Sequence, residues 1–386
     1  MEITFSNLDK EYSKGKREYI GDIQPKFWYI KKIPGSGKVL VKRQHSESTG
    51  ANKPKSKMFN HIGEYFGYQI AKKADIKSCP VDLVTLHDRK NRFSEKMLFY
   101  TACASHFLKN NGTYILPGEA VILDFCSDRS EEYKKTLAGF FSNEENTSYM
   151  PEYLEDNVDC VIASIVNETI KVEESMAKRK KEQITEDCSE NISNAIDMIV
   201  YDCIFGNHDR HSGNWSMEID PDNGRVTLYP LYDNEAVLGL RKTEAEVENI
   251  LSSNNVDKEI EEKIFSRMGY GNKRSEISYK DMLEHLVKKY PEYAIPSIKK
   301  ITSKVDEKFI NELYDGVRGI STRGESAEEL NYSDELPETY RQLGMRMFSN
   351  RRNYALDLLK RTKFSKRTHN EKAETNKRKN EELELV

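Results

Sequence analysis

The chain lacks the features that mark a secreted or membrane-spanning protein. Its six cysteines form no Cys-x-x-Cys pair and no framework spacing, so we expect free thiols in a reducing compartment rather than disulfides or a structural zinc site. No apolar run is long enough to cross a bilayer, because the most apolar stretch, residues 195–205, is interrupted by Asp197 and Asp202. The first residues show neither the basic nor the apolar region of a Sec-type signal, so we expect none.

A strong net charge is also absent. Lys and Arg total 60 and Asp and Glu total 64, which gives a formal charge of -4. The molecule as a whole therefore gives no indication of a nucleic-acid partner. Hydrophobic residues make up 37% and charged residues 32% of the 386 residues, which is polar for a folded protein but far from a disordered composition. The length suffices for one large two-lobed domain or for two ordinary domains.

Residues 1–105 are predicted to form a small β-rich unit with one helix. The helix is predicted over residues 57–74, where apolar residues recur at helical spacing. A basic segment with two glycines, Gly15 and Gly21, occupies residues 13–22 and is interpreted as a loop between the first two strands. β-Branched and aromatic runs predict strands, the first three in a meander, at residues 3–5, 27–30, 39–41, 81–86 and 96–101.

Residues 106–320 are predicted to form a larger, mainly helical unit. Apolar residues three and four apart predict buried helices over residues 156–169 and 192–204. A β-hairpin is predicted from residues 215–219 and 225–231, which flank the turn Asp-Pro-Asp-Asn-Gly. This unit therefore combines helices with one hairpin.

Residues 321–386 are predicted to contain a polar linker, one helix near residues 337–359 and a charged tail from residue 361 that is largely disordered. Seven Lys or Arg residues lie within residues 363–379. A nucleic-acid contact or a nuclear-import signal in this basic tail stays open, although a solvated tail explains the charges equally well.

Residues 206–214, Gly-Asn-His-Asp-Arg-His-Ser-Gly-Asn, carry groups suited to phosphoryl transfer from ATP. That reaction needs a carboxylate beside the acceptor hydroxyl, oxygen ligands for Mg²⁺ and a lysine on the phosphates. Asp209 and Asn214 have the Asp-x-x-x-x-Asn spacing of a kinase catalytic loop. Because the segment follows a predicted buried helix, Asp209 is expected at an exposed edge next to a rigid element.

Asp233 is the candidate for a second Mg²⁺ ligand. It follows the second strand of the hairpin, where a kinase carries the aspartate of its Asp-Phe-Gly motif. If Ile219 lies opposite Arg225, the hairpin register places Asp233 near His211. We therefore expect Asp233 to return to the catalytic segment.

Lys42 is the candidate for the phosphate-binding lysine. It ends an apolar strand, as the lysine of a kinase third strand does. Glu64 lies in the following predicted helix and could pair with Lys42. The basic loop with Gly15 and Gly21 would then cover the phosphates, although no Gly-x-Gly-x-x-Gly motif is present.

These residues resemble the kinase core of HipA-like toxins and, more closely, the short CtkA-type serine/threonine kinases of bacterial pathogens. The resemblance covers residues 1–315. It implies an α+β, two-lobed protein-kinase-like fold with a small β-rich N-lobe and a larger, mainly helical C-lobe that carries a catalytic hairpin. The shared motifs are Gly-Asn-x-Asp-Arg-His-x-Gly-Asn-Trp at 206–215, Pro-Leu-Tyr-Asp at 230–233, Val-Lys at 41–42, and Gly-Glu-Tyr at 63–65 followed by Ile-Lys at 76–77.

The resemblance implies an ATP- and Mg²⁺-dependent serine/threonine kinase that phosphorylates itself and a protein substrate. The implied site residues are Asp209 as the catalytic aspartate, His211 as a supporting loop histidine, Asn214 and Asp233 as Mg²⁺ ligands, Lys42 on the phosphates and Glu64 orienting Lys42. HipA toxins carry an additional N-terminal module, and this chain reaches Lys42 too early to contain it. A DNA-binding antitoxin partner is therefore in question, and the expected location is a bacterial cytoplasm or a host cell reached without a Sec signal.

Other interpretations of the same residues stay open. The family's catalytic signature is similar to that of phosphoinositide kinases, which allows a lipid substrate. His61, His208-Asp209 and Asp233 follow the order of an HD-type metal-dependent phosphohydrolase, although that site requires its His-Asp pair on a helix. Zinc binding by His208 and His211 lacks two further ligands nearby. A pseudokinase that acts as a scaffold through its tail is the non-enzymatic alternative.

Overall fold

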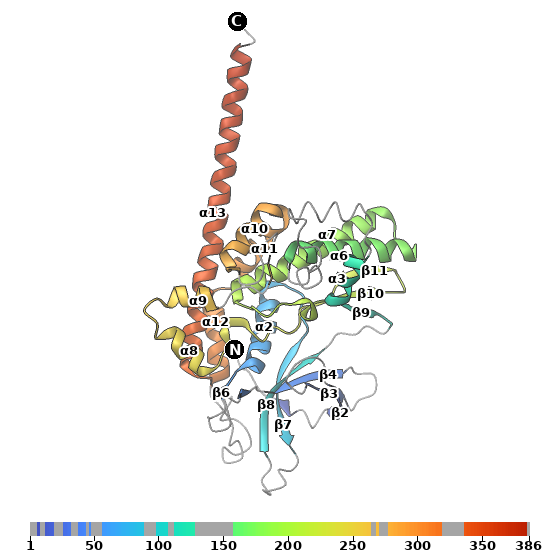
Figure 1. Cartoon of the computed structure of the whole chain (residues 1–386), viewed down its shortest axis with the longest axis vertical. Coiled ribbons are helices and arrows are strands. Elements are labelled where there is room, and N and C mark those ends of the chain that lie inside the picture. Colours follow the sequence, from blue (N-terminus) through green and yellow to red (C-terminus); the bar gives the residue numbers. More distant parts are fainter. Residues whose placement is uncertain are drawn as a thin grey trace.

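The molecule has one part built on a large β-sheet and one part built mainly of helices (Figure 1). This arrangement is the predicted α+β, two-lobed kinase-like fold, with the sheet in the N-lobe and the helices in the C-lobe. The computed structural model describes residues 6–7, 12–18, 26–31, 38–43, 46–47, 56–88, 98–106, 112–127, 157–263, 268–269, 277–318 and 336–383.

The N-lobe sheet has six strands in the order β1-β7-β8-β4-β3-β2. β1 runs parallel to β7, and the other neighbouring strands are antiparallel. Valine, isoleucine and aromatic side chains, which favour a pleated and half-buried surface, recur in β3, β4, β7 and β8. The strands are β1 (Ser6–Asn7), β2 (Tyr12–Glu18), β3 (Lys26–Lys31), β4 (Lys38–Arg43), β7 (Val81–Asp88) and β8 (Leu98–His106), and a separate pair consists of β5 (Ser46–Glu47) and β6 (Ser56–Lys57).

The segment predicted as a glycine loop is largely a strand, which corrects the predicted meander. β2 includes Gly15 and pairs with β3, so the meander consists of β2, β3 and β4. The pairing register shifts between Lys14 and Arg17. A glycine tolerates such a bulge, and the alternating pattern that identifies a strand is interrupted there. Gly21 and the strand predicted at residues 3–5 lie outside the described residues.

Helix α2 (Asn60–Ala74) lies between the sheet and the helical part (Figure 1). Its apolar face is fully buried at Phe66 and Ile70, as the spacing of its apolar residues predicts. It ends at Asp75, which adopts a left-handed conformation. This helix therefore contacts both lobes.

The C-lobe is organised around the long helix α7. The second half of α7 is almost completely buried, including Ile196, Val200 and Phe205. It ends at Gly206, whose φ of 75° is favourable for glycine. Besides α7 (Lys181–Phe205), the described helices here are α3 (Gly118–Ser127), α6 (Val158–Met176), α8 (Glu244–Leu251), α9 (Val256–Lys263), α10 (Tyr279–Lys289), α11 (Pro291–Lys304), α12 (Glu307–Arg318), and the short turns η2 (Ser212–Asn214) and η3 (Val237–Gly239).

The predicted hairpin forms the core of a three-stranded antiparallel sheet. Its strands are β9 (Tyr114–Pro117), β10 (Ser216–Asp220) and β11 (Arg225–Leu228), in the order β11-β10-β9. The predicted register was wrong by one residue, because Arg225 lies opposite Asp220 and not Ile219. The loop therefore consists of the four residues 221–224. The Asp220 side chain stabilises it by accepting hydrogen bonds from the backbone N–H groups of Asp222 and Asn223.

The C-terminal segment is helical where disorder was predicted. Helix α13 (Glu338–Leu383) contains the helix expected near residues 337–359 and continues through the charged tail, projecting beyond the body in Figure 1. Lys, Arg and Glu have high helix propensity, so a charged composition alone does not exclude a helix. Its first half buries Tyr340 and Phe348, and Phe348 stacks on Phe205 with ring centroids 5.5 Å apart. The buried half of α13 therefore belongs to the hydrophobic core of the helical part.

Two expectations from composition also have an answer in the structure. All six cysteines are free thiols in this structure, and five of them are buried. Within the described ranges, no helix has both the length and the apolarity needed to cross a bilayer.

Candidate active site

Lys42, Glu64 and Asp233 meet between the two lobes. The Nζ of Lys42, on β4, lies 3.2 Å from Oε2 of Glu64 on α2 and 2.5 Å from Oδ1 of Asp233. It also lies 3.7 Å from Oε2 of Glu235. Three distant segments of the chain thus contribute to one cluster, and the predicted Lys42–Glu64 pair is present.

Charge compensation keeps the buried ammonium group protonated. Burial alone lowers the pKa of Lys42, but the carboxylates of Asp233, Glu64 and Glu235 outweigh burial and raise this pKa well above its ordinary value. Burial raises the pKa of Glu64, and Lys42 opposes part of that rise. Because Glu64 is only 1% exposed, loss of Lys42 would leave a buried carboxylate without its ion-pair partner.

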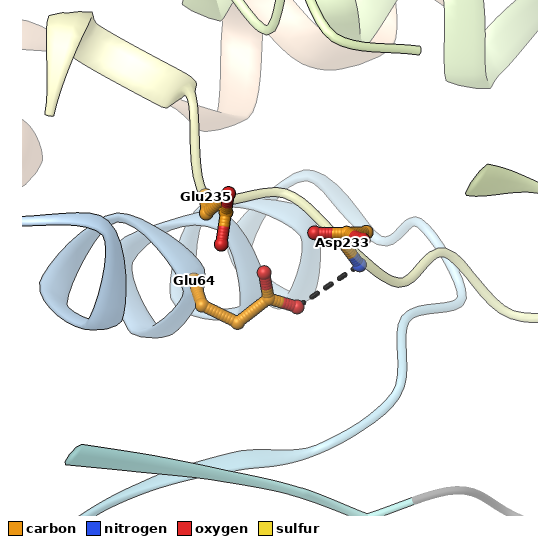
Figure 2. Close-up of side chains that lie close together, drawn as sticks. All are labelled: Glu64, Asp233 and Glu235. Carbon is orange, nitrogen blue, oxygen red and sulfur yellow. Dashed lines mark hydrogen bonds between the residues drawn. The ribbon is translucent and has the colours of Figure 1, made fainter. Parts of the chain in front are cut away.

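The segment of residues 233–235 packs directly against the backbone of α2. A Cβ on Gly63 would lie 2.1 Å from the carbonyl oxygen of Glu235, and a Cβ on Gly67 would lie 2.4 Å from the Cβ of Asn234. These glycines are one helical turn apart, so together they form a flat strip on the helix. The close approach lets Glu64 accept a hydrogen bond from the backbone N–H of Asp233, at 3.0 Å (Figure 2).

The catalytic segment predicted at residues 206–214 follows α7 directly. Backbone N–H groups of Gly206 and Asn207 both donate to the carbonyl oxygen of Asp202. His211 begins the turn η2 by accepting a hydrogen bond at Nδ1 from the Gly213 N–H, at 3.1 Å. The Nδ2 of Asn214 donates to the carbonyl oxygen of Asp209 at 2.7 Å. The predicted shape-supporting role of His211 is consistent with this capping contact.

Arg210 joins the catalytic segment to the segment around Asp233. Its guanidinium binds the buried Asp202 carboxylate through Nε and Nη2, at 2.9 and 3.1 Å. It also donates to the carbonyl oxygens of Asn214 and Tyr232, each at 2.7 Å, and to Oδ1 of Asn234 at 2.6 Å. These five bonds match the five donors of an arginine. Arg210, only 2% exposed, therefore fixes both segments relative to α7.

Arg241 links Asp209 to the acidic cluster. Its Nη1 forms an ion pair with Oδ2 of Asp209, and its Nε lies 3.4 Å from Oε1 of Glu235. Since Glu235 also faces Lys42, charges of alternating sign run from Lys42 through Glu235 and Arg241 to Asp209. The lysine of one lobe and the aspartate of the other thus belong to one electrostatic chain.

The donor set fits a hard divalent cation. Carboxylate oxygens of Glu64, Asp233 and Glu235 all lie within 4.8 Å of one another (Figure 2), and carboxylate and amide oxygens are the ligands that Mg²⁺ accepts. The Lys42 ammonium faces these three carboxyl groups, and the Arg241 guanidinium faces one of them, Glu235, so two cations meet three carboxyl groups. A further cation near Asp233 would therefore reduce an excess of negative charge.

The histidines of the alternative interpretations do not belong to this cluster. Of the described residues, those grouped as possible metal ligands are Glu64, Asp233 and Glu235, without His61 or His208. Burial lowers the pKa of His61 to about 3, and burial with the nearby Lys242 and Arg241 lowers that of His208 to about 4. The His-Asp pair lies in a loop between α7 and η2, not on the helix that an HD-type site requires.

The predicted residues fall into two groups. Lys42, Glu64 and Asp233 are in contact, and Asp209, His211 and Asn214 lie together in the catalytic loop. The link between the groups was not predicted, because it depends on long-range contacts of Arg210, Arg241 and Glu235. Asp202, an acidic residue inside an apolar helical run, was a signal in the sequence for a buried ionic partner of this kind.

Comparisons with known proteins support the fold and do not identify the protein. No protein-family model matches the chain, and no curated protein matches its sequence. The structure is similar to that of the Helicobacter pylori proinflammatory kinase CtkA, with a TM-score of 0.59, 14% identity, and coverage of 93% of this chain and 96% of that chain. HipA in a Shewanella oneidensis toxin–antitoxin complex with HipB and operator DNA matches with a TM-score of 0.40, 11% identity, and coverage of 88% and 64%.

Proposed function

We propose that this chain is an ATP- and Mg²⁺-dependent protein kinase that phosphorylates serine or threonine hydroxyls. The observation that carries the proposal is the meeting of Lys42, Glu64 and Asp233, from three distant segments of a kinase-like fold, and their link through Glu235 and Arg241 to Asp209. Structural ion pairs also bury charges, but this set has the residue types that phosphoryl transfer requires, in the chain order that a kinase uses.

Lys42 binds the phosphates of ATP in this proposal. Its raised pKa keeps it positively charged, and Glu64 holds its ammonium from the side of α2. The triphosphate then replaces Asp233 as the second partner of Lys42. Asp233 and Asn214 would hold Mg²⁺, which when bound neutralises charge on the phosphates.

Asp209 orients the acceptor hydroxyl and takes its proton. The hydroxyl oxygen forms a bond to the γ-phosphorus as the bond from that phosphorus to the β,γ-bridging oxygen breaks, and ADP leaves with the bonding electrons. Asp209 is suited to this because its loop is fixed by the hydrogen bonds of Asp202, Arg210 and Asn214. A fixed carboxylate places the hydroxyl without reorganising during the reaction.

Protein hydroxyls, including those of the chain itself, are the proposed acceptors. The CtkA structure is described as that of a kinase, and the resemblance in motif order points to serine and threonine. The protein substrate would be recognised outside the residues discussed here.

The test is incubation of the full chain with γ-³²P-labelled ATP and Mg²⁺, followed by phosphoamino-acid analysis. Wild type is expected to label itself or an added protein on serine or threonine. Asp209→Asn and Asp233→Asn should reduce labelling by at least about 10³-fold, because each removes one part of the transfer machinery. Asp222→Asn, an exposed aspartate in the hairpin turn, is the matched control and should label normally.

Three other outcomes would replace the proposal. Release of free phosphate without protein labelling would indicate a hydrolase. Labelling confined to phosphoinositide vesicles would indicate a lipid kinase. Nucleotide binding without any transfer would indicate a pseudokinase.

A further inference from the structure

Arg241 is the cation nearest to the proposed catalytic base. It follows η3 in the chain and reaches back to Asp209, so that its guanidinium contacts Oδ2 of the carboxylate. Its Nε faces Glu235, which in turn faces Lys42. Arg241 therefore lies between the lysine proposed to bind the phosphates and the aspartate proposed to bind the acceptor.

The surroundings of Arg241 differ from those of a structural arginine. Arg210 is 2% exposed and binds one buried carboxylate, one side-chain amide and two backbone carbonyls. The Arg241 side chain is 34% exposed, and its described ion-pair partners, Asp209 and Glu235, both belong to the site. Asp209 and Glu235 are 14% and 11% exposed, so the guanidinium compensates two largely buried carboxylates of the site while part of it still faces solvent.

The two ion pairs also have a consequence for the reaction. Oδ2 of Asp209 is an oxygen that could accept the proton of the incoming hydroxyl, and Arg241 contacts that oxygen. The ion pair stabilises the deprotonated carboxylate, so Asp209 becomes a stronger base when the guanidinium releases this oxygen. A group that attracts Arg241 away from Asp209 must be anionic, and it must lie close to both Glu235 and Asp209. A phosphate group of a bound nucleotide would have this charge.

We propose that Arg241 is a catalytic residue that binds the γ-phosphoryl group of ATP during transfer, with Glu235 as the residue that positions it. This inference rests on the proposed kinase function. When ATP is bound, the guanidinium moves from Asp209 to the oxygens of the γ-phosphoryl group, while Glu235 retains its Nε. A planar guanidinium binds two phosphate oxygens at once and so stabilises the charge that they carry while the bond to ADP breaks.

This arrangement couples two events. The nucleotide provides the anion that draws Arg241, and the same movement frees Asp209 for the acceptor hydroxyl. Phosphate binding therefore activates the base. ADP lacks the γ-phosphate, so it should leave Arg241 on Asp209.

Nucleotide affinity tests the inference separately from activity. The dissociation constants of ATP and ADP, each with Mg²⁺, would be measured by displacement of a fluorescent ADP analogue from the full chain. Arg241→Gln should weaken ATP binding about tenfold and leave ADP binding unchanged, because only ATP carries the contacted group. The single-turnover rate of phosphoryl transfer should fall by at least about 10²-fold.

Two further variants complete the experiment. Arg241→Lys keeps the charge without the planar fork, and it should lower the preference for ATP over ADP by several-fold even if Arg241→Gln folds poorly. Arg346→Gln removes an arginine from an ion pair with Asp257 on the surface of α13 and should behave as wild type in both assays.

Distinct results would overturn the inference. A faster single-turnover rate in Arg241→Gln would mean that the arginine only blocks Asp209. An unchanged ratio of the ATP and ADP dissociation constants in Arg241→Gln would mean that Arg241 does not touch the γ-phosphate. Failure of the wild type to bind ATP would overturn the proposed function together with this inference, whereas the first two results concern Arg241 alone.

Discussion

The backbone N–H of Asp233 donates to the Glu64 carboxylate across 3.0 Å, while the Lys42 ammonium contacts both carboxylates. Asp233 has a φ of 57°, a conformation that few residues other than glycine adopt readily. The hydrogen bond to Glu64 holds it there. One buried glutamate thus fixes both the lysine of the N-lobe and the main chain of the C-lobe.

Removal of Arg210 should destabilise the C-lobe strongly. Arg210→Met leaves the Asp202 carboxylate buried without its ionic partner, and we expect unfolding free energy to fall by about 3–5 kcal/mol. Urea unfolding would measure this. In the double variant Asp202→Asn/Arg210→Met, the loss should be smaller than the sum of the single losses, because the remaining buried charge is gone. A loss in the double variant equal to the sum of the two single losses would contradict the pairing of Arg210 with Asp202.

Substitution of Gly67 by alanine should separate helix α2 from the loop beside Asp233. The added Cβ would lie 2.4 Å from Asn234, so one of the two must move, and we expect a loss of about 1–3 kcal/mol with weaker ATP binding. Lys72→Ala, on the exposed side of the same helix, should change stability by less than about 0.5 kcal/mol. Thermal unfolding and nucleotide titration would distinguish these variants.

Loss of the Asp233 carboxylate should weaken metal binding. With ADP present, Asp233→Asn should lower the affinity for Mn²⁺, used as a spectroscopic substitute for Mg²⁺, by at least about tenfold. Even the loss of a residue that only supports a metal ligand commonly lowers metal affinity by about tenfold or more. Electron paramagnetic resonance of free Mn²⁺ would report it. Asp222→Asn serves as the control, and an unaltered Mn²⁺ affinity in Asp233→Asn would exclude Asp233 as a ligand.

His61 should make stability depend on pH below neutrality. Burial lowers its folded-state pKa to about 3, below the unfolded value of about 6.5. The unfolded chain therefore binds the proton more readily, and stability is present above pH 6.5 and falls as the pH drops toward 3. Between pH 7.5 and 5.0, protonation of His61 in the unfolded chain should lower the free energy of unfolding by about 2 kcal/mol. His61→Gln should remove that part of the loss in urea unfolding, and an unchanged pH dependence would contradict the assignment.

The effect of truncating α13 should depend on where the shortened chain ends. A chain ending at Lys360 loses the charged part of the helix and should retain stability and phosphoryl transfer, because the α13 residues that the structure describes as buried, up to Leu359, precede that point. A chain ending at Pro337 also loses Tyr340 and Phe348 from the core and should not fold stably. Circular dichroism and the labelling assay would separate the two. Loss of activity in the longer chain would assign a role to the tail.

Local patterns predicted much of this fold and only part of its site. The helices α2, α6 and α7 and the strands β3, β4, β7, β10 and β11 follow from periodic apolar residues, a property of neighbouring residues. β9 was not predicted, because its pairing with β10 depends on residues about 100 positions away. β2 was missed because Gly15 interrupts its pattern.

The same limit applies to the site. Lys42, Glu64, Asp209 and Asp233 could be proposed because residue type and chain order match a known chemistry. Arg241 and Glu235 could not, because their importance depends on side chains that meet only in the folded chain.

Helix α2 is attached to the C-lobe along its whole length. The backbone N–H of Phe59 donates to the carbonyl oxygen of Leu240, Gly63 and Gly67 contact the 233–235 segment, and beyond the helix Cys79 donates to Leu231. Because α2 also packs against β7 and β8, it joins the sheet to the C-lobe, and the Lys42–Glu64 pair lies where β4 meets this helix. The separation of Nζ from Oε2, 3.2 Å here, thus measures how closely β4 of the N-lobe sheet approaches α2.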